Sequence, residues 1–120
     1  MSESDVINSE QILIPLVIPE KRELDVPGAP PVRLQTLDLA RHIAIAPDHK
    51  QYVVATFADR NLGREYVTTV YPQQGGYHTL VRLPVCEYVF DDPDDALERH
   101  VELVQVIQQG KLKSYLKQQQ

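Results

Sequence analysis

An aspartate-rich run near the C-terminus constrains the fold most, because it fixes where a helix begins. Within residues 91–95, Asp92 is placed to cap that helix and Pro93 suits its first position. Asp94 and Asp95 fall in the first turn, where the helix dipole favours negative charge. Gly110 is typical of a position just beyond a helix end. The predicted helix has an apolar side formed by Leu97, Val101 and Val104, flanked by Ala96, Leu103 and Ile107.

The segments before this helix have the composition of strands. Four of them are rich in Val, Tyr, Thr and Phe: residues 51–58, 65–71, 77–83 and 85–90. The first two connections between them are short and turn-like, as in hairpins. Pro84 marks either a bend in the last strand or a boundary between two strands. The predicted fold class is therefore α+β: an antiparallel meander of three to four strands packed against an amphipathic C-terminal helix.

The segment 36–46 is ambiguous between helix and strand. Leu37, Leu39, Ala40, Ile43 and Ala44 roughly follow a helical stripe. The four residues from Ile43 onward would also serve as a short strand, and periodicity does not decide over so few residues. We favour a short helix before the sheet, ending ahead of Pro47.

The ends of the chain differ in character from its middle. Residues 1–10 are acidic and without periodicity, and we expect a disordered lead-in. Residues 11–32 read as an extended arm followed by a proline-rich connector, because Pro15 cannot donate to a central strand. Residues 33–110 form the predicted single α+β domain, and residues 111–120 a basic tail.

Composition narrows the class of protein. The formal net charge of −5 argues against binding to nucleic acid or to an anionic membrane. The single cysteine, Cys86, excludes an internal disulfide framework and favours a reducing compartment. The longest apolar stretch, residues 12–18, is far too short to span a bilayer. We therefore expect a soluble cytoplasmic protein.

A single helix covers only one face of a sheet, and both faces of this meander carry apolar side chains. Simple hairpin pairing predicts that Tyr52, Val54 and Thr56 share a face with Val67, Thr69 and Tyr71. The other face then carries Val53, Ala55, Phe57, Tyr66, Thr68 and Val70. Burial of large apolar side chains is too favourable for both faces to stay exposed. The second cover is the arm over 12–18, the segment 36–46, or another protein chain.

No catalytic, cofactor or metal motif is present in the sequence pattern. The four histidines lack close metal-ligand spacing, and the aspartate run lacks the spacing of a calcium loop. Cys86 lies among alternating apolar residues, which favours a small buried side chain over a nucleophile. His100 falls beside the apolar side of the helix and is interpreted as a boundary residue packed on the sheet. The candidates for a ligand or anion site are Tyr66, His78, Arg82 and Cys86.

Two functional hypotheses follow from this pattern. The first is a non-catalytic accessory or regulatory protein that acts through protein contacts, as a homodimer or with a different protein partner. Its interface candidates are the arm residues Ile12, Ile14, Leu16 and Ile18. The second is a small-molecule-binding protein or enzyme with a pocket between sheet and helix.

Overall fold

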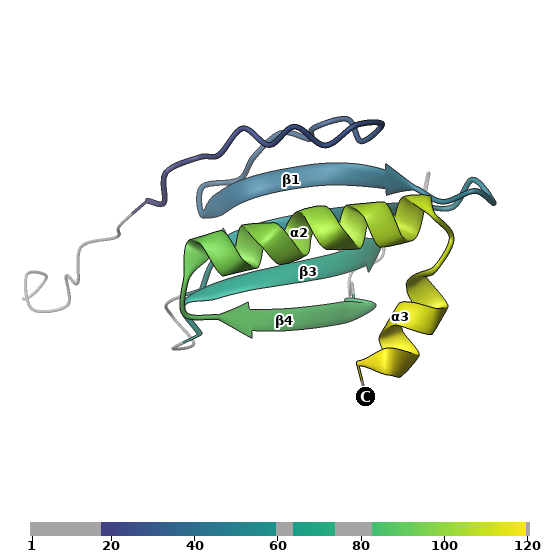
Figure 1. Ribbon diagram of the computed structural model, residues 1–120. Coiled ribbons are helices and arrows are strands. Elements are labelled where there is room, and N and C mark those ends of the chain that lie inside the picture. Colours follow the sequence, from purple (N-terminus) through teal and green to yellow (C-terminus); the bar gives the residue numbers. More distant parts are fainter. Residues whose placement is uncertain (1–17, 60–63, 74–82, 120) are drawn as a thin grey trace, which may run out of the picture.

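The computed structural model describes residues 18–59, 64–73 and 83–119. The elements in this part of the chain are β1 (Asp38–Ile45), β2 (Gln51–Ala58), β3 (Tyr66–Pro72), β4 (Cys86–Phe90), α2 (Pro93–Gln108) and α3 (Leu112–Gln118) (Figure 1). Neighbouring strands pair antiparallel in the order β1-β2-β3-β4, and α2 contacts all four. The predicted class, an antiparallel α+β meander with a C-terminal helix, is confirmed.

The start of α2 matches its sequence signature. The Asp92 side chain accepts a hydrogen bond of 2.7 Å from the backbone N–H of Asp94, and Pro93 is the first helical residue. At the other end, Gly110 has a φ of +73°, and a Cβ there would lie 3.2 Å from the Pro47 ring. Gly110 therefore meets two demands that other residues meet poorly: a left-handed backbone and close packing on the β1–β2 turn.

The cap gives the first prediction. Asp92→Ala should lower the free energy of unfolding by about 1 kcal/mol, because the N–H of Asp94 loses its acceptor. Urea denaturation followed by circular dichroism measures the change. Asp91→Ala removes a neighbouring exposed carboxylate that makes no cap, and it should shift stability by less than about 0.5 kcal/mol. Equal losses in the two variants would contradict the assigned cap.

The segment 36–46 is not a helix, so the prediction of a short helix there is wrong. Residues 38–45 form β1 and pair with β2 along its whole length. Ala40, His42 and Ala44 are buried and alternate with the less buried Arg41 and Ile43. Pairing with β2 and burial of this alternating face outweigh a helical stripe that is only approximate.

The register of β2 on β3 also differs from the predicted one by one residue. Val54 lies opposite Val70, and Thr56 opposite Thr68. The connection closes with a hydrogen bond of 2.9 Å from the Asp59 N–H to the Glu65 carbonyl oxygen. The positive φ of Glu65 shapes this turn in a way that composition does not reveal. The predicted strand over 77–83 lies outside the described residues except for Leu83, which belongs to no strand.

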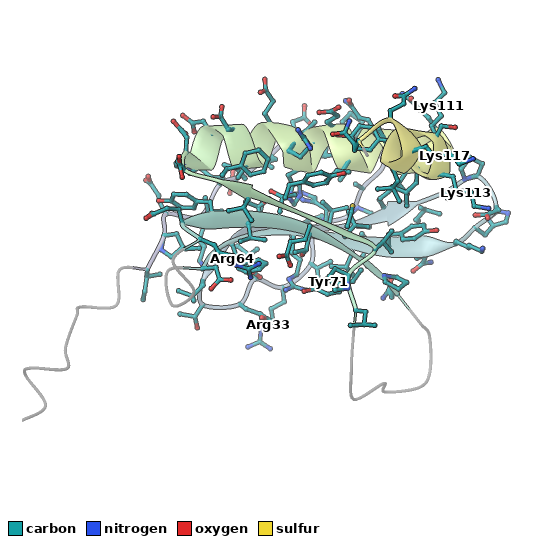
Figure 2. The ribbon with its side chains drawn as sticks, turned by 90° about the horizontal axis from the view of Figure 1, so that it is seen from below. Arg33, Arg64, Tyr71, Lys111, Lys113 and Lys117 are labelled. Carbon is teal, nitrogen blue, oxygen red and sulfur yellow. The ribbon has the colours of Figure 1, made fainter. Side chains whose placement is uncertain are left out.

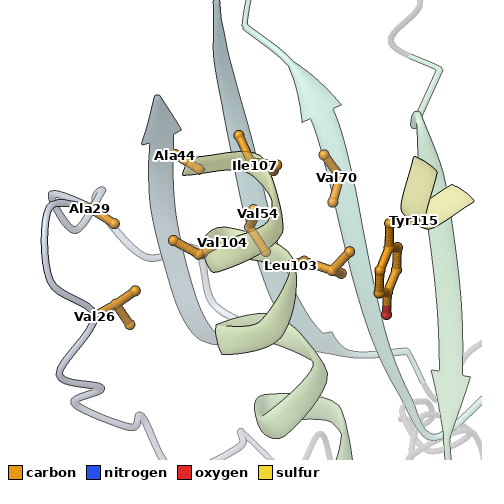
Figure 3. Packing of buried hydrophobic residues seen from close by; sticks show 9 residues of the cluster. All are labelled: Val26, Ala29, Ala44, Val54, Val70, Leu103, Val104, Ile107 and Tyr115. Carbon is orange, nitrogen blue, oxygen red and sulfur yellow. The ribbon is translucent and has the colours of Figure 1, made fainter. Parts of the chain in front are cut away.

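The main core lies between α2 and the sheet. Val54, Val70, Leu103, Val104 and Ile107 are fully buried. Figure 3 shows further members of this cluster: Ala44 from β1, Val26 and Ala29 on one side of α2, and Tyr115 from α3 on the other. The N-terminal segment and α3 therefore widen the core on both flanks of α2.

Residues 22–32 cover the outer edge of β1. The Val32 N–H donates to the Arg41 carbonyl oxygen at 2.9 Å, and the Ile43 N–H donates to that of Pro30 at 3.0 Å. Farther along, the Gln108 side chain donates to the Pro27 carbonyl oxygen at 2.8 Å. Residues 22–32 thus connect β1 to α2 and add to the layer that covers the same face of the sheet as α2.

Candidate functional site

Of the four predicted ligand residues, the two that the structure describes lie apart from each other. Tyr66 and Cys86 both lie on the face toward α2, but Tyr66 is opposite Phe90 and Cys86 is opposite Val70, at different ends of the β3–β4 pair. Tyr66 packs beside the small cluster around Leu39 and Leu97, whereas Cys86 packs against the main core. His78 and Arg82 lie outside the described residues.

Cys86 is a half-buried free thiol. Burial raises its pKa, and a hydrogen bond with Tyr88 and the charge of Arg99 only partly oppose that shift. A thiol with a raised pKa holds its proton and is a poor nucleophile at neutral pH. The geometry supports the interpretation of Cys86 as a small core residue.

A buried chain of hydrogen bonds links α2 to three strands. His42 Nδ1 lies 2.9 Å from His100 Nε2, and His100 Nδ1 lies 3.0 Å from Thr56 Oγ1. The chain continues from Thr56 to Thr68 Oγ1 at 2.8 Å, and Thr68 donates to the Ala96 carbonyl oxygen at 2.8 Å. His100, Thr56 and Thr68 are fully buried, and His42 is 5% exposed. Buried polar groups of this kind are tolerated when each has a partner.

All hydrogen bonds of this buried chain are donated in the same direction, from His42 toward Ala96. Thr68 gives its only hydroxyl proton to Ala96, so it accepts from Thr56. Thr56 then accepts from His100, whose Nδ1 must carry a hydrogen. Nε2 of a neutral His100 is left as the acceptor for the Nδ1–H of His42. The donor and the acceptor of every hydrogen bond in this buried chain are therefore determined.

Both imidazoles are neutral at pH 7, because the pKa of each lies below the usual value for histidine. Burial lowers the pKa of His42, and burial together with the charge of His42 lowers the pKa of His100 to about 3. Sequence reasoning treated His100 as a boundary residue and missed this chain. The available signal was its position four residues after Ala96 and three before Leu103, inside the apolar stripe of α2.

His42 reaches the side of the molecule where residues 22–34 lie along β1. It lines a cavity of about 510 Å³ there, together with Ala40, Arg41, Val26 and Pro31. The other members of the hydrogen-bond chain do not line this cavity. The arrangement joins elements of the core, and the hydroxyl groups of Thr56 and Thr68 are fully buried within it.

The face of the sheet away from α2 is partly covered from within. Ala55, Val67 and Thr69 are fully buried on this face. Residues 35–38 form one wall of a cavity of about 410 Å³ there, with Arg41, Phe57 and Tyr71. Figure 2 shows Tyr71 and Arg64 on this side of the sheet. Of the predicted covers, the segment 36–46 belongs mainly to the sheet itself, and residues 12–17 lie outside the described part.

The outer edge of β4 is open in the described part of the chain. β4 ends the strand order, and no backbone hydrogen bond there reaches its outer side. The large apolar side chains exposed on and next to this strand are Val89 (50%), Val85 (38%) and Leu83 (74%). Unpaired strand edges with apolar side chains are sites where another chain can add. This edge is the best candidate for a contact surface.

The described residues contain neither a cluster of metal ligands nor a helix of membrane-spanning type. Within them, no three His, Cys, Asp or Glu side chains are grouped so that they could hold a metal ion. In the same residues, no helix has the length and apolar character needed to cross a membrane.

No protein-family model, curated protein sequence or solved structure matches this chain.

Proposed function

We propose that the protein is a non-catalytic accessory or regulatory protein that acts through protein contacts, and that it pairs with a second copy of itself along β4. The open edge of β4 carries this proposal. Three exposed aliphatic side chains lie on or beside the same strand, where they favour association over exposure to water. The free thiol of Cys86 fits the reducing cytoplasm that we propose as its location.

Pairing of two copies through β4 would leave no open sheet edge in the described part of either copy. The β1 edge is covered by residues 30–32, so β4 is the edge left open in the described part of the chain. An antiparallel β4–β4 contact is related by a two-fold axis and uses the same surface on both copies. It would join the two sheets into one and leave a covered edge at each end. Such a contact closes on itself and does not propagate.

Charge complementarity supports the antiparallel arrangement. Figures 1 and 2 show α3 in the same layer as α2 and extending beyond the edge of β4, near the start of that strand. In an antiparallel pair, this end lies beside the end of the other β4, where residues 91–95 follow. α3 and the residue before it contribute Lys111, Lys113 and Lys117, whereas 91–95 contribute four aspartates. Opposite charges would therefore meet twice across the contact.

The side-chain register is also compatible with self-pairing. Centred on Tyr88, the contact places Cys86 opposite Phe90 and Glu87 opposite Val89, so no like charges face each other. Glu87 is paired with Arg64 in its own chain, which offsets its negative charge. Val89 is half-exposed on the same face and is the side chain that the second copy would cover.

This register predicts the effect of charge at position 89. Val89→Glu should weaken self-association by about tenfold or more, because each new carboxylate faces Glu87 of the second copy. Val89→Lys should be tolerated better, since its ammonium group faces the same carboxylate. Light scattering and analytical ultracentrifugation over a concentration series measure the dimer fraction of each variant.

Ile45→Glu is the matched control. Ile45 is 39% exposed and lies on β1, at the other side of the sheet, so this variant should associate like the original chain. A chain that stays monomeric at every concentration would refute the proposed homodimer. Removal of residues 1–17 separates this contact from the predicted arm contact, in which Ile12, Ile14, Leu16 and Ile18 would carry the association. Ile18, the described member of that group, is 58% exposed.

A further inference from the structure

A groove opens at the end of the molecule where α2 turns into α3. It has a volume of about 580 Å³, within the range typical of small-molecule sites. One wall is the β1–β2 turn with Pro47, and the other is α3. Gly110 also lines the groove and lies so close to Pro47 that an added Cβ would come within 3.2 Å of the proline ring. The groove does not involve Val89 or the hydrogen-bond chain around His100.

The inside of this groove is mainly apolar. Tyr52, Val85, Ile107, Leu112 and Leu116 contribute to its lining. They come from β2, the residue before β4, α2 and α3. Side chains of this kind suit an alkyl chain, which is stabilised by roughly 0.8 kcal/mol for each buried methylene.

The charges at this groove are mostly positive. Lys50 and Lys113 line it, and the single lining carboxylate, on Asp48, accepts a hydrogen bond of 3.1 Å from the Lys50 N–H. Figure 2 shows Lys113 in one corner of the molecule with Lys111 and Lys117. Four of the five lysines of a chain with a net charge of −5 therefore belong to this end. A local positive field on an acidic protein selects for an anionic group.

We propose that this groove binds a single-chain amphiphile with an anionic head, such as a medium-chain carboxylate. The alkyl chain lies against Ile107, Leu112 and Leu116, and the head lies between Lys50 and Lys113. The proposal combines the apolar lining with the sign of the charge. It does not rest on the proposed self-association through β4, although Val85 and Lys113 belong to both surfaces.

Titration of the isotope-labelled full chain with dodecanoate, below its micelle concentration, tests this inference by NMR. Saturable shifts should concentrate on residues 46–52 and 107–116. Dodecyltrimethylammonium, which has the same chain length and the opposite charge, should bind at least about tenfold more weakly. Absence of saturable shifts, shifts centred on β4 or on the second face, or equal binding of the two amphiphiles would each overturn the proposal.

Lysine variants test the position of the head. Lys113→Glu should weaken dodecanoate binding by about threefold to tenfold, as expected when one exposed ionic contact is reversed. Lys117→Glu makes the same charge change on the same helix but outside the groove lining, so it should change the affinity by about twofold or less. Equal effects of the two variants would show that overall charge, and not this groove, governs binding.

Discussion

Lowering the pH from 7 to 4 should reduce the free energy of unfolding, and His100 alone should account for about 3 kcal/mol of the loss. In the folded chain, burial and the charge of His42 lower the pKa of His100 to about 3. Nε2 of His100 accepts the hydrogen bond from His42. Protonation of this nitrogen would place two N–H donors against each other and break that hydrogen bond. The folded protein therefore resists protonation at this residue.

The direction of the effect follows from proton binding in the two states. Above a pH of about 6.5, the ordinary pKa of histidine, the imidazole is neutral in both states and stability is complete. Below that pH, the unfolded chain takes up a proton that the folded chain refuses. Stability then falls by about 1.4 kcal/mol for each pH unit until the folded pKa near 3 is reached. Burial lowers the pKa of His42 as well, so it contributes in the same direction.

Urea denaturation at pH 7, 6, 5 and 4 measures this dependence. His100→Gln should be less stable at pH 7 but should lose about 1.4 kcal/mol per pH unit less than the original chain below pH 6. Because carboxylates also titrate in this range, the difference between the two chains is the informative quantity. His49→Gln removes an exposed imidazole outside the hydrogen-bond chain and should keep the original slope. An unchanged slope in His100→Gln would refute the assignment.

Leu103→Ala should cost about 2–5 kcal/mol, the range for truncating a fully buried leucine. Leu103 is 0% exposed and belongs to the cluster between α2 and the central strands. Its truncation removes apolar contacts and leaves a cavity, because α2 contacts all four strands and has little freedom to move inward. The midpoint of urea denaturation at pH 7 reports the loss.

The control for this truncation is Leu83→Ala. It makes the same chemical change at a side chain that is 74% exposed. At a protein concentration where the chain is monomeric, its stability should stay within about 0.5 kcal/mol of the original chain. Similar losses in both variants would show that exposure is not what separates the two leucines, and the assigned core would have to be revised.

The parts of the fold that sequence predicted are those fixed by local chemistry. Asp92 defines the start of α2 by capping the N–H of Asp94, and Pro93 does so through its restricted backbone. Both effects act within three residues of the chain. The strand over 51–58 is β2 with the predicted bounds, because its β-branched and aromatic residues suit a pleated, buried surface.

The parts that sequence missed depend on contacts between distant residues. β1 is a strand because β2 pairs with it, although its own residues fit a rough helical stripe. The register of β3 depends on a turn that includes the positive φ of Glu65. A shift by one residue exchanged the predicted faces of Thr68 and Thr69, so the partners of Thr68 could not be found from its strand alone.

The candidate site was equally hard to predict. His42 and His100 are 58 residues apart, and their contact exists only once β1 and α2 are placed. The open edge of β4 likewise depends on the strand order. The sequence predicts the apolar arm residues 12–18 as interface candidates because their hydrophobic side chains can be recognised directly. An unpaired strand edge depends on which strands pair, and amino-acid composition does not reveal this.

The one-way hydrogen-bond chain has a consequence for how the sequence can vary. Within the residues that the structure describes, His42, His100, Thr56 and Thr68 each serve as the sole partner of a neighbour. Changing any one of them therefore leaves a buried donor or acceptor unmatched. Replacing the whole set by apolar side chains of similar volume avoids that cost, whereas stepwise replacement passes through it. We therefore expect these four positions to change together in evolution and not one at a time.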